Sequence, residues 1–522
     1  MTKVFDKRFA AIVANDEKVL AGGLKGIEKE SLRIDPRGYL AQTGHPAVLG
    51  SALSNNFITT DFSEALLEFI TPAYASTWEA LQFLCDVHQF TYAGLGDELL
   101  WAASMPCRIP ADKDIPLARY GNSNVGQMKT IYRRGLGFRY GRSMQTIAGV
   151  HFNYSLAEQF WPVYREVTGN TDTETEFRSS HYLGLVRNFR RFGWLVLYLF
   201  GSSPAMCKSF AGGRNVQMSE LNAETLYEPF GTSLRMSDLG YSNKNQSRLN
   251  ISLNSLDDYV RDLSAAITTP EPDYEKIGVK VNGRYRQLNA NQLQIENEYY
   301  SPVRPKRVAM SGERPTMALR RGGIQYIEIR SLDINMDDPA GINQNTMRFI
   351  EAFLIYCLIE DSPRLCDKSL DETKHNQAMT AKQGRDPKFQ LLRNGKGIAL
   401  HAWAGEILEK VLGIAEVIDR QEGCNSYVEA VRRMQFLNEN PDATPSATIL
   451  KELRKAKCSY FDLGLALSEV HRDYFAAITP LSLERRVQFE QEARDSLQRQ
   501  HDIEASDELG FDEYLANYFR QD

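Results

Sequence analysis

The sequence lacks any hydrophobic segment long enough to cross a membrane. Its most apolar stretch, Trp194–Phe200, is far shorter than the roughly 20 apolar residues that span a bilayer, so we expect it in the core. Residues 1–20 mix Lys3, Asp6 and Lys7 with short apolar runs and contain no uninterrupted apolar core of a signal peptide. We therefore expect a cytoplasmic protein that makes no membrane contact.

The chain also lacks an excess of positive charge. It has 61 lysines and arginines against 67 aspartates and glutamates, a net charge of −6. Nucleic-acid-binding proteins usually carry a strong basic bias, so we expect no nucleic-acid partner. Hydrophobic residues make up 43% and charged residues 25% of the 522 residues, which is typical of a globular protein with room for more than one domain-sized unit.

The cysteines lack the CxxC spacing of a structural zinc site. There are 7 of them, at positions 85, 107, 207, 357, 366, 424 and 458. An odd and scattered set argues against a disulfide framework and fits a reducing cytosol. We expect all of them to be packing residues or incidental thiols, with a single catalytic cysteine as the alternative.

Several catalytic motifs are missing. The sequence contains no GxxxxGK[ST], HExxH or GxSxG motif and no dinucleotide fingerprint. His471, Arg472 and Asp473 match the start of a kinase catalytic loop, but the other kinase motifs are absent. Among enzymes, this leaves metal-dependent phosphoryl transfer or metal-assisted hydrolysis.

The pattern that is present predicts an α+β fold. Period-two alternation or β-forming residues predict strands at residues 26–34, 66–72, 149–154 and 324–332. A capping-box pattern at Ser255 predicts a helix toward Ile267, and beyond about residue 340 helical spacing dominates. We expect a largely antiparallel sheet surrounded by helices over residues 1–340, and a mainly helical region over residues 341–522 packed on it, or one continuous domain.

Carboxylates occur within these apolar strands. Glu28 and Glu30 would share one strand face with Cα atoms about 6.5–7 Å apart. Asp61 and Glu68 flank a second strand, and Glu328 lies in a third. Since a lone buried carboxylate is unfavourable, oxygen ligands of this kind predict a Mg²⁺ or Mn²⁺ site. The alternatives are a solvent-facing edge strand for Glu28 and Glu30, and a surface ion pair between Glu328 and Arg330.

Basic and aromatic residues complete the candidate site. Arg330 shares a strand face with Glu328, where its guanidinium could bind phosphate. Residues 304–307, Arg-Pro-Lys-Arg, could do the same or form a solvated basic turn. Tyr132, Tyr241 and Tyr300 each lie near turn signals, and any one of them alone could equally be a packing residue.

Long segments follow one another in a recognisable order over roughly the first 340 residues. They are GIEKESLR (26–33), TGHPAVLGSAL (43–53), ITTDFSEALLEFITP (58–72), SMPC (104–107), YRRGLGFRYG (132–141), MQTIAGVHFNYS (144–155), RFGWLVLYLFGSSPA (191–205), TSLRMSDLGYSNKNQS (232–247), IENEYYSPVRPKR (295–307) and GGIQYIEIRSLDIN (322–335). With these segments the chain resembles the glutamate–cysteine ligases of the proteobacterial type, which catalyse the first step of glutathione synthesis.

The resemblance implies a fold similar to that of glutamine synthetase, with a curved antiparallel sheet forming a funnel-shaped active site. It implies that ATP and glutamate meet there over Mg²⁺. The metal-binding side chains it implies are Glu28, Glu30, Asp61, Glu68, His151 and Glu328. The cysteine-binding residues it implies are Tyr132, Arg235, Tyr241 and Tyr300, with Phe62 nearby. Arg330 would face the transferring phosphate, with Glu328 beside it as the second catalytic residue.

The reaction implied has two steps. ATP phosphorylates the γ-carboxylate of L-glutamate, and the amine of L-cysteine then displaces phosphate from the acyl phosphate. The resemblance also implies feedback inhibition by glutathione and a monomeric protein. Three alternatives are a related carboxylate–amine ligase with another amine acceptor, a metal-assisted hydrolase, and a non-catalytic protein on the same fold.

Overall fold

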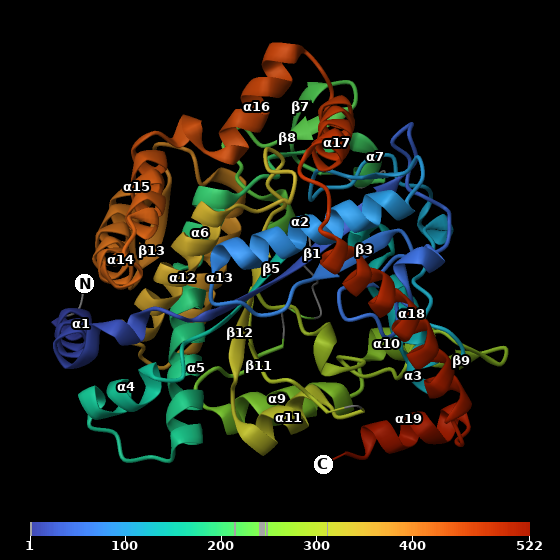
Figure 1. Ribbon diagram of the computed structural model, residues 1–522, viewed down its shortest axis with the longest axis horizontal. Helices are drawn as coiled ribbons and strands as arrows, with labels where there is room; N and C mark the ends of the chain where they lie inside the picture. The colour runs from blue at the N-terminus through green and yellow to red at the C-terminus, as the bar shows by residue number, and fades with distance from the viewer. Residues whose placement is uncertain (1–2, 213–215, 240–245, 247–248, 311, 522) are drawn as a thin grey trace.

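A seven-stranded antiparallel sheet lies at the centre of the computed structural model, which describes residues 3–212, 216–239, 246, 249–310 and 312–521 (Figure 1). The strands follow the order β11–β12–β5–β1–β3–β2, and β4 pairs with the end of β1. Their bounds are β1 Leu24–Ile34, β2 Ile58–Thr60, β3 Leu66–Ile70, β4 Leu99–Leu100, β5 Val150–Ser155, β11 Val303–Lys306 and β12 Tyr326–Leu332. The four strands predicted from the sequence are confirmed as β1, β3, β5 and β12.

Three small antiparallel sheets lie outside the main one. They are β6 Ala205–Cys207 with β8 Thr225–Tyr227 and β7 Ser219–Asn222, β9 Lys280–Val281 with β10 Arg284–Tyr285, and β13 Gln390–Arg393 with β14 Lys396–Ala399.

Helices surround the sheet. Their bounds are α1 Lys3–Asp16, α2 Thr77–Gly94, α3 Asn124–Tyr140, α4 Phe160–Thr168, α5 Glu174–Phe192, α6 Trp194–Phe200, α7 Lys208–Ala211, α9 Leu256–Thr268, α10 Pro272–Ile277, α11 Pro315–Gly322, α12 Gln344–Ile359, α13 Asp367–Gln383, α14 Leu400–Glu422, α15 Ser426–Glu439, α16 Pro445–Ala456, α17 Tyr460–Ala477, α18 Leu483–Ala505 and α19 Phe511–Phe519. Every residue of α6 is buried, as its apolar sequence predicted. In the described part of the chain, none of these helices is both long and apolar enough to cross a bilayer.

The two faces of β1 carry different groups. Lys25 points away from Glu28 and Glu30 and forms a fully buried ion pair of 2.8 Å with Glu351 of α12, whose carboxylate also accepts from the hydroxyl of Tyr427. Each of these two buried charges thus has a partner of opposite sign on this face. The other face of β1 is therefore the one available for binding.

The C-terminal third is mainly helical, as predicted. Ile407, Val411, Ile414 and Ile418 are buried in α14, which ends at Gly423 with φ +66°. Glycine adopts this left-handed conformation without a steric penalty. In Figure 1, α14 and α15 lie at one side of the molecule and α18 and α19 at the other.

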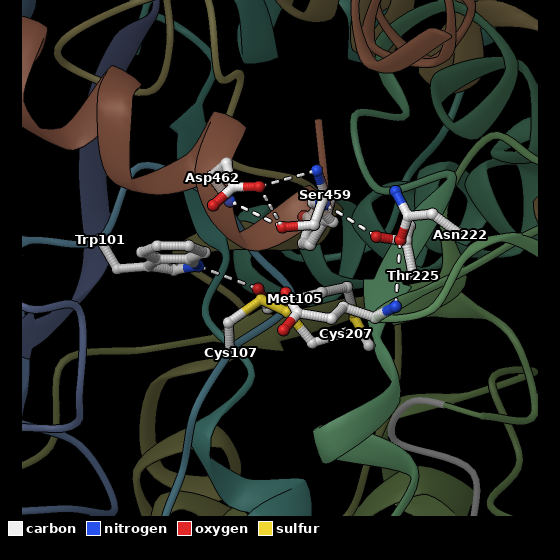
Figure 2. The surroundings of a disulfide bond; sticks show 10 residues. Trp101, Met105, Cys107, Cys207, Asn222, Thr225, Ser459 and Asp462 are labelled. Atoms are coloured by element: carbon white, nitrogen blue, oxygen red, sulfur yellow. Dashed lines mark hydrogen bonds between the residues drawn. A yellow bond between two sulfur atoms is a disulfide. The ribbon is translucent and has the colours of Figure 1, made fainter. Parts of the chain in front are cut away.

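The cysteine prediction is wrong for one pair. Cys107 and Cys207 form a disulfide, with Cα atoms 5.5 Å apart (Figure 2). Cys107 follows β4 in a buried loop, and Cys207 ends β6. The two are 100 residues apart in sequence, so spacing gave no sign that folding brings them together. The other five cysteines are free.

Candidate active site

Three glutamates and a histidine from the neighbouring strands β5, β1 and β3 meet on one face of the sheet. Glu28 lies opposite His151 of β5 in the strand register, and Glu30 lies opposite Glu68 of β3. His151 Nδ1 is 3.2 Å from Glu28 Oε2, and its Nε2 is 3.7 Å from Glu30 Oε1. Because β1 is a central strand and Glu30 is only 4% exposed, the alternative of a solvent-facing edge strand is wrong.

Three of these residues have the geometry of a metal site. Glu28, Glu68 and His151 each present one ligand atom, and these atoms all lie within 4.8 Å of one another. Glu30 is adjacent, and its Oε2 accepts a 2.6 Å hydrogen bond from the backbone N–H of Gly149. Carboxylate oxygens with one imidazole suit a hard divalent cation.

The charges in this cluster repel one another. Burial, together with the charges of Glu28, Asp61 and Glu30, raises the pKa of Glu68 well above its ordinary value. Burial and Asp61 likewise raise the pKa of Glu30, although His151 acts against them. A bound cation would neutralise this repulsion. Asp61, in the turn between β2 and β3, thus lies close enough to act on both glutamates.

Glu328 belongs to a more positive part of the same site. Burial disfavours its charged form, but the neighbouring basic groups, led by Lys306 and Arg330, together outweigh burial and hold its pKa well below the ordinary value. Lys306 Nζ lies 3.6 Å and Arg330 Nη1 3.1 Å from Glu328 Oε1, and His151 Nδ1 is 3.8 Å from the same oxygen. At 1% exposure Glu328 is buried, so a surface ion pair with Arg330 is wrong.

The two carboxylate oxygens of Glu328 differ in their contacts. Oε1 faces the basic residues, whereas Oε2 is buried and has no hydrogen-bond partner among the described residues. Glu28 differs, because Asn153 Nδ2 donates to its Oε1 at 2.8 Å. Burial disfavours the charged form of Glu28 too, but the hydrogen bond to His151 and the charges of Lys306 and His151 together outweigh burial and lower the Glu28 pKa. An unpartnered, charged carboxylate oxygen beside two basic residues fits a bound cation or a hydrogen-bonding ligand.

The side chain of Arg235 contacts the backbone of Arg330. Its Nη2 donates to the carbonyl of Arg330 at 2.8 Å, and its Nη1 is 3.8 Å from Asp333. A Cβ on Gly149, directly before β5, would stand 2.0 Å from Arg235 Nη2, so any side chain there would displace this guanidinium. Tyr300 is close by, since both Arg235 and Arg330 act on its pKa, which burial raises.

The other proposed acceptor-binding residues lie by α3. Phe62 is buried beside Gly137 of that helix, where a Cβ would lie 3.7 Å from the ring. Tyr132 is half-buried on α3, and burial followed by the charge of Glu298 raises its pKa. Tyr241 lies outside the described residues.

The structure adds basic residues that the sequence did not single out. Arg133 of α3 donates to the carbonyl of Asp61 and stacks 4.5 Å from the ring of Tyr120, and Lys129 lies one turn earlier. Both act on Glu68 electrostatically. In the sequence, Arg133 and Lys129 occupy ordinary helix positions, and no motif there indicates that they act on the acidic cluster. Lys306 is in strand β11, so residues 304–306 do not form a solvated turn.

The family is shown by comparison with known proteins. The model of the glutamate–cysteine ligase family matches residues 10–380. The glutamate–cysteine ligase of Alcanivorax borkumensis is 49% identical over 99% of both chains. That of Pseudomonas putida is 46% identical, covering 99% of this chain and 98% of its own.

Solved structures agree with the sequence comparison. The glutamate–cysteine ligase of Francisella tularensis, solved in complex with AMP, superposes with a TM-score of 0.90 at 34% identity, covering 96% of this chain and 98% of its own. A bifunctional glutathione synthetase from Pasteurella multocida shares the fold, with a TM-score of 0.75 at 23% identity over 93% of this chain and 58% of its own. These findings confirm the resemblance seen in the sequence. The chain belongs to the glutamate–cysteine ligase family.

Proposed function

We propose that the chain joins the γ-carboxylate of L-glutamate to the amine of L-cysteine, using ATP. The observation that carries this proposal is the meeting of Glu28, Glu68 and His151 in one cluster next to Arg330 and Lys306. Acidic metal ligands beside phosphate-binding cations are what phosphoryl transfer to a carboxylate requires. The names of the relatives and the AMP bound to the Francisella enzyme support the same activity.

The chemistry needs positioning more than a protein nucleophile. Transfer of the terminal phosphoryl group of ATP to a γ-carboxylate oxygen releases ADP and makes the γ-carbon electrophilic. The cysteine nitrogen then attacks that carbon, the carbon–oxygen bond to phosphate breaks, and the nitrogen loses a proton. No thiol of the protein is required, which agrees with the absence of a cysteine among the cluster residues.

The acidic residues would hold a divalent cation. We propose that Glu28, Glu30, Asp61, Glu68, His151 and Glu328 bind Mg²⁺, or Mn²⁺ in its place. When bound, the cation supplies charge neutralisation and alignment of the polyphosphate. The raised pKa of Glu68 and the unpartnered oxygen of Glu328 support this assignment.

Arg330 and Lys306 would bind the phosphate groups. Arg330 is half-buried and Lys306 lies beside it on the same face of the sheet, so both charges face the cluster. A guanidinium binds phosphate oxygens in a bidentate manner. We propose that Arg330 and Glu328 act at the reacting centre, with Glu328 fixing the arginine through their 3.1 Å contact.

The acceptor pocket would be formed by Tyr132, Arg235, Tyr241, Tyr300 and Phe62. Phe62 lies beside α3, the helix that carries Tyr132, and Arg235 and Tyr300 lie near Arg330 of β12, which supports this assignment. We also propose, from the family resemblance, that the enzyme is a cytoplasmic monomer inhibited by glutathione.

ADP release in the presence of glutamate tests the acceptor. We expect release with cysteine and 2-aminobutyrate, and much less with ammonia or a polyamine. Equal ADP release with cysteine and ammonia would contradict the assignment in favour of another carboxylate–amine ligase. Turnover of substrate with Mg²⁺ but without ATP would favour a metal-assisted hydrolase instead, whereas a non-catalytic protein would release no ADP with any amine.

A further inference from the structure

A buried carboxylate, that of Asp333, directly follows β12, the strand that carries Arg330. Its Oδ2 accepts from the backbone N–H of Ser202 at 2.8 Å and from the hydroxyl of Ser203 at 2.6 Å, and its Oδ1 accepts from the hydroxyl of Ser233 at 2.9 Å. A buried carboxylate is unfavourable unless donors or a cation satisfy it, and these three donors meet that need. The carboxylate therefore joins three chain segments that lie far apart in the sequence.

The backbone of Arg235 depends on the same contacts. Arg235 is the middle residue of η5, a short 3-10 helix at Leu234–Met236. Ser233 caps this helix, because its Oγ accepts from the last N–H of η5 at 3.3 Å. The carbonyl of Ser203 accepts from the first N–H of η5 at 2.7 Å. Both serines that donate to Asp333 thus also hold the backbone on either side of Arg235.

The side chain of Arg235 faces Asp333 as well. Its guanidinium is buried, with Nη1 3.8 Å from Asp333 Oδ1 and Nη2 donating to the carbonyl of Arg330. Burial raises the pKa of Asp333, and the charge of Arg235 is the strongest of the effects that oppose this rise. Because opposite charges attract strongly where water is excluded, Asp333 limits where the guanidinium can lie.

The position of this guanidinium matters for the proposed acceptor. Among the five residues proposed for the acceptor pocket, Arg235 alone carries a positive charge; the others are Tyr132, Tyr241, Tyr300 and Phe62. The acceptor amino acid has a carboxylate, which a guanidinium binds through directional, paired hydrogen bonds. A guanidinium that is free to turn would lose part of this binding.

We propose that Asp333 is a positioning residue, which holds the guanidinium of Arg235 in place for the carboxylate of the amino-acid acceptor. Asp333 acts through Arg235 and not by touching the acceptor. The proposal rests on the proposed function, since it requires an acceptor amine that carries a carboxylate. Loss of the Asp333 charge should therefore weaken recognition of the acceptor carboxylate more than binding of glutamate.

Asp333→Asn removes the charge and can keep the hydrogen bonds. The amide oxygen can accept from Ser202 and Ser203 in place of Oδ2, and the amide nitrogen can donate to Ser233, whose hydroxyl is also an acceptor. We expect the Michaelis constant for cysteine to rise at least about tenfold and that for glutamate less than about threefold. Equal increases in both constants, or no increase in either, would overturn the proposal.

Cysteamine, which is cysteine without the carboxylate, separates lost carboxylate recognition from general damage to the enzyme. ADP release at saturating glutamate and ATP gives kcat/KM for both amines. We expect the preference for cysteine over cysteamine to fall at least about tenfold in Asp333→Asn. An unchanged preference would overturn the proposal. Where the wild-type protein uses cysteamine too slowly to measure, the two Michaelis constants decide.

Arg235→Gln tests whether Asp333 acts through Arg235. Adding Asp333→Asn to this variant should raise the Michaelis constant for cysteine less than about twofold further, because the guanidinium that Asp333 holds is already absent. Additive effects of the two substitutions would overturn the proposal. Asp419→Asn is the matched control, because Asp419 of α14 is also buried and accepts from the backbone N–H groups of Tyr427 and Val428. It should leave both Michaelis constants unchanged.

Ser233→Ala replaces Asp333→Asn if denaturant unfolding shows that the latter does not fold. It removes the hydroxyl that joins Asp333 to η5, so we expect the same selective increase in the Michaelis constant for cysteine, and an equal increase for glutamate would overturn the proposal.

Crystal structures of the wild type and Asp333→Asn separate this proposal from the proposed function. If the wild-type protein ligates no amine, the proposed function fails, but the position of Arg235 can still be compared. A guanidinium displaced from the Arg330 carbonyl in the variant would support the role of Asp333, and one that keeps its 2.8 Å hydrogen bond would overturn it.

Discussion

Nη2 of Arg235 donates a 2.8 Å hydrogen bond to the backbone carbonyl of Arg330. A side chain proposed for acceptor binding therefore also holds the strand that carries the proposed phosphate-binding arginine. The contact depends on the missing side chain of Gly149, where a Cβ would stand 2.0 Å from the same nitrogen. The guanidinium of Arg235 thus connects the proposed acceptor site with the proposed phosphate site.

Gly149→Ala should displace this guanidinium. We expect kcat/KM for cysteine to fall at least about tenfold, because a misplaced binding group loses transition-state contacts. Gly413→Ala is the matched control, since a Cβ there meets only Phe9 at 3.8 Å in a helix interior. Steady-state kinetics of both variants test this, and unchanged kinetics in Gly149→Ala would show that Arg235 can move without loss.

Glu28→Gln should remove a metal ligand and also a negative charge that raises the pKa of Glu68. We expect turnover to fall at least about 100-fold, while the free energy of unfolding changes by less than about 1 kcal/mol. Rates and denaturant unfolding measure the two effects. Glu220→Gln, which removes an exposed partner of Lys208, is the control and should keep full activity. Severe destabilisation of Glu28→Gln would instead indicate a structural role.

Tyr300→Ala should act on the acceptor more than on glutamate. The Tyr300 hydroxyl donates to Met236 Sδ at 3.1 Å, and the ring lies close to Arg235 and Arg330. We expect the Michaelis constant for cysteine to rise at least about tenfold and that for glutamate less than about threefold. Equal increases in both constants would count against the pocket assignment.

Much of the fold could be predicted because strand periodicity and capping are local signals. Alternation in residues 26–34 and 324–332 identified β1 and β12, and the carboxylates in them stood out because their neighbours are apolar. The order of the strands is not local. Nothing in the sequence placed β5 between β1 and β12, which is what brings His151 opposite Glu28. Residues 304–306 stayed ambiguous for the same reason, because only pairing with β12 makes them a strand.

Stability should fall in mild acid because of His471. Burial, followed by the charge of Lys29, lowers the pKa of His471 to about 4. The unfolded chain, with an ordinary pKa near 6.5, binds the proton first, so stability is complete above about pH 6.5 and is lost as the pH falls toward 4. We expect a loss of about 2 kcal/mol between pH 7.5 and 5.0 from this residue. Denaturant unfolding at both pH values should show a smaller loss in His471→Asn, and an equal loss would contradict the assignment.

The buried pair of Lys25 and Glu351 offers a double-mutant test. Lys25→Met leaves the Glu351 carboxylate buried without its cation, although the Tyr427 hydroxyl still donates to it, so we expect a loss of about 3–5 kcal/mol in the free energy of unfolding. Adding Glu351→Gln should recover most of this loss, because the neutral amide still accepts from Tyr427. Additive losses in the double variant would mean that the two charges are not coupled.

Helix α19 bears on the order in which the enzyme is assembled during translation. Leu515 of α19 packs with Met128 and Ile131 of α3, the helix that carries Tyr132. Leu515 follows both partners and every strand of the central sheet in the sequence, so a ribosome that has made the central sheet has not yet made the outer support of α3. We therefore expect the proposed acceptor side to complete its folding after the proposed cation-binding cluster when the chain is synthesised.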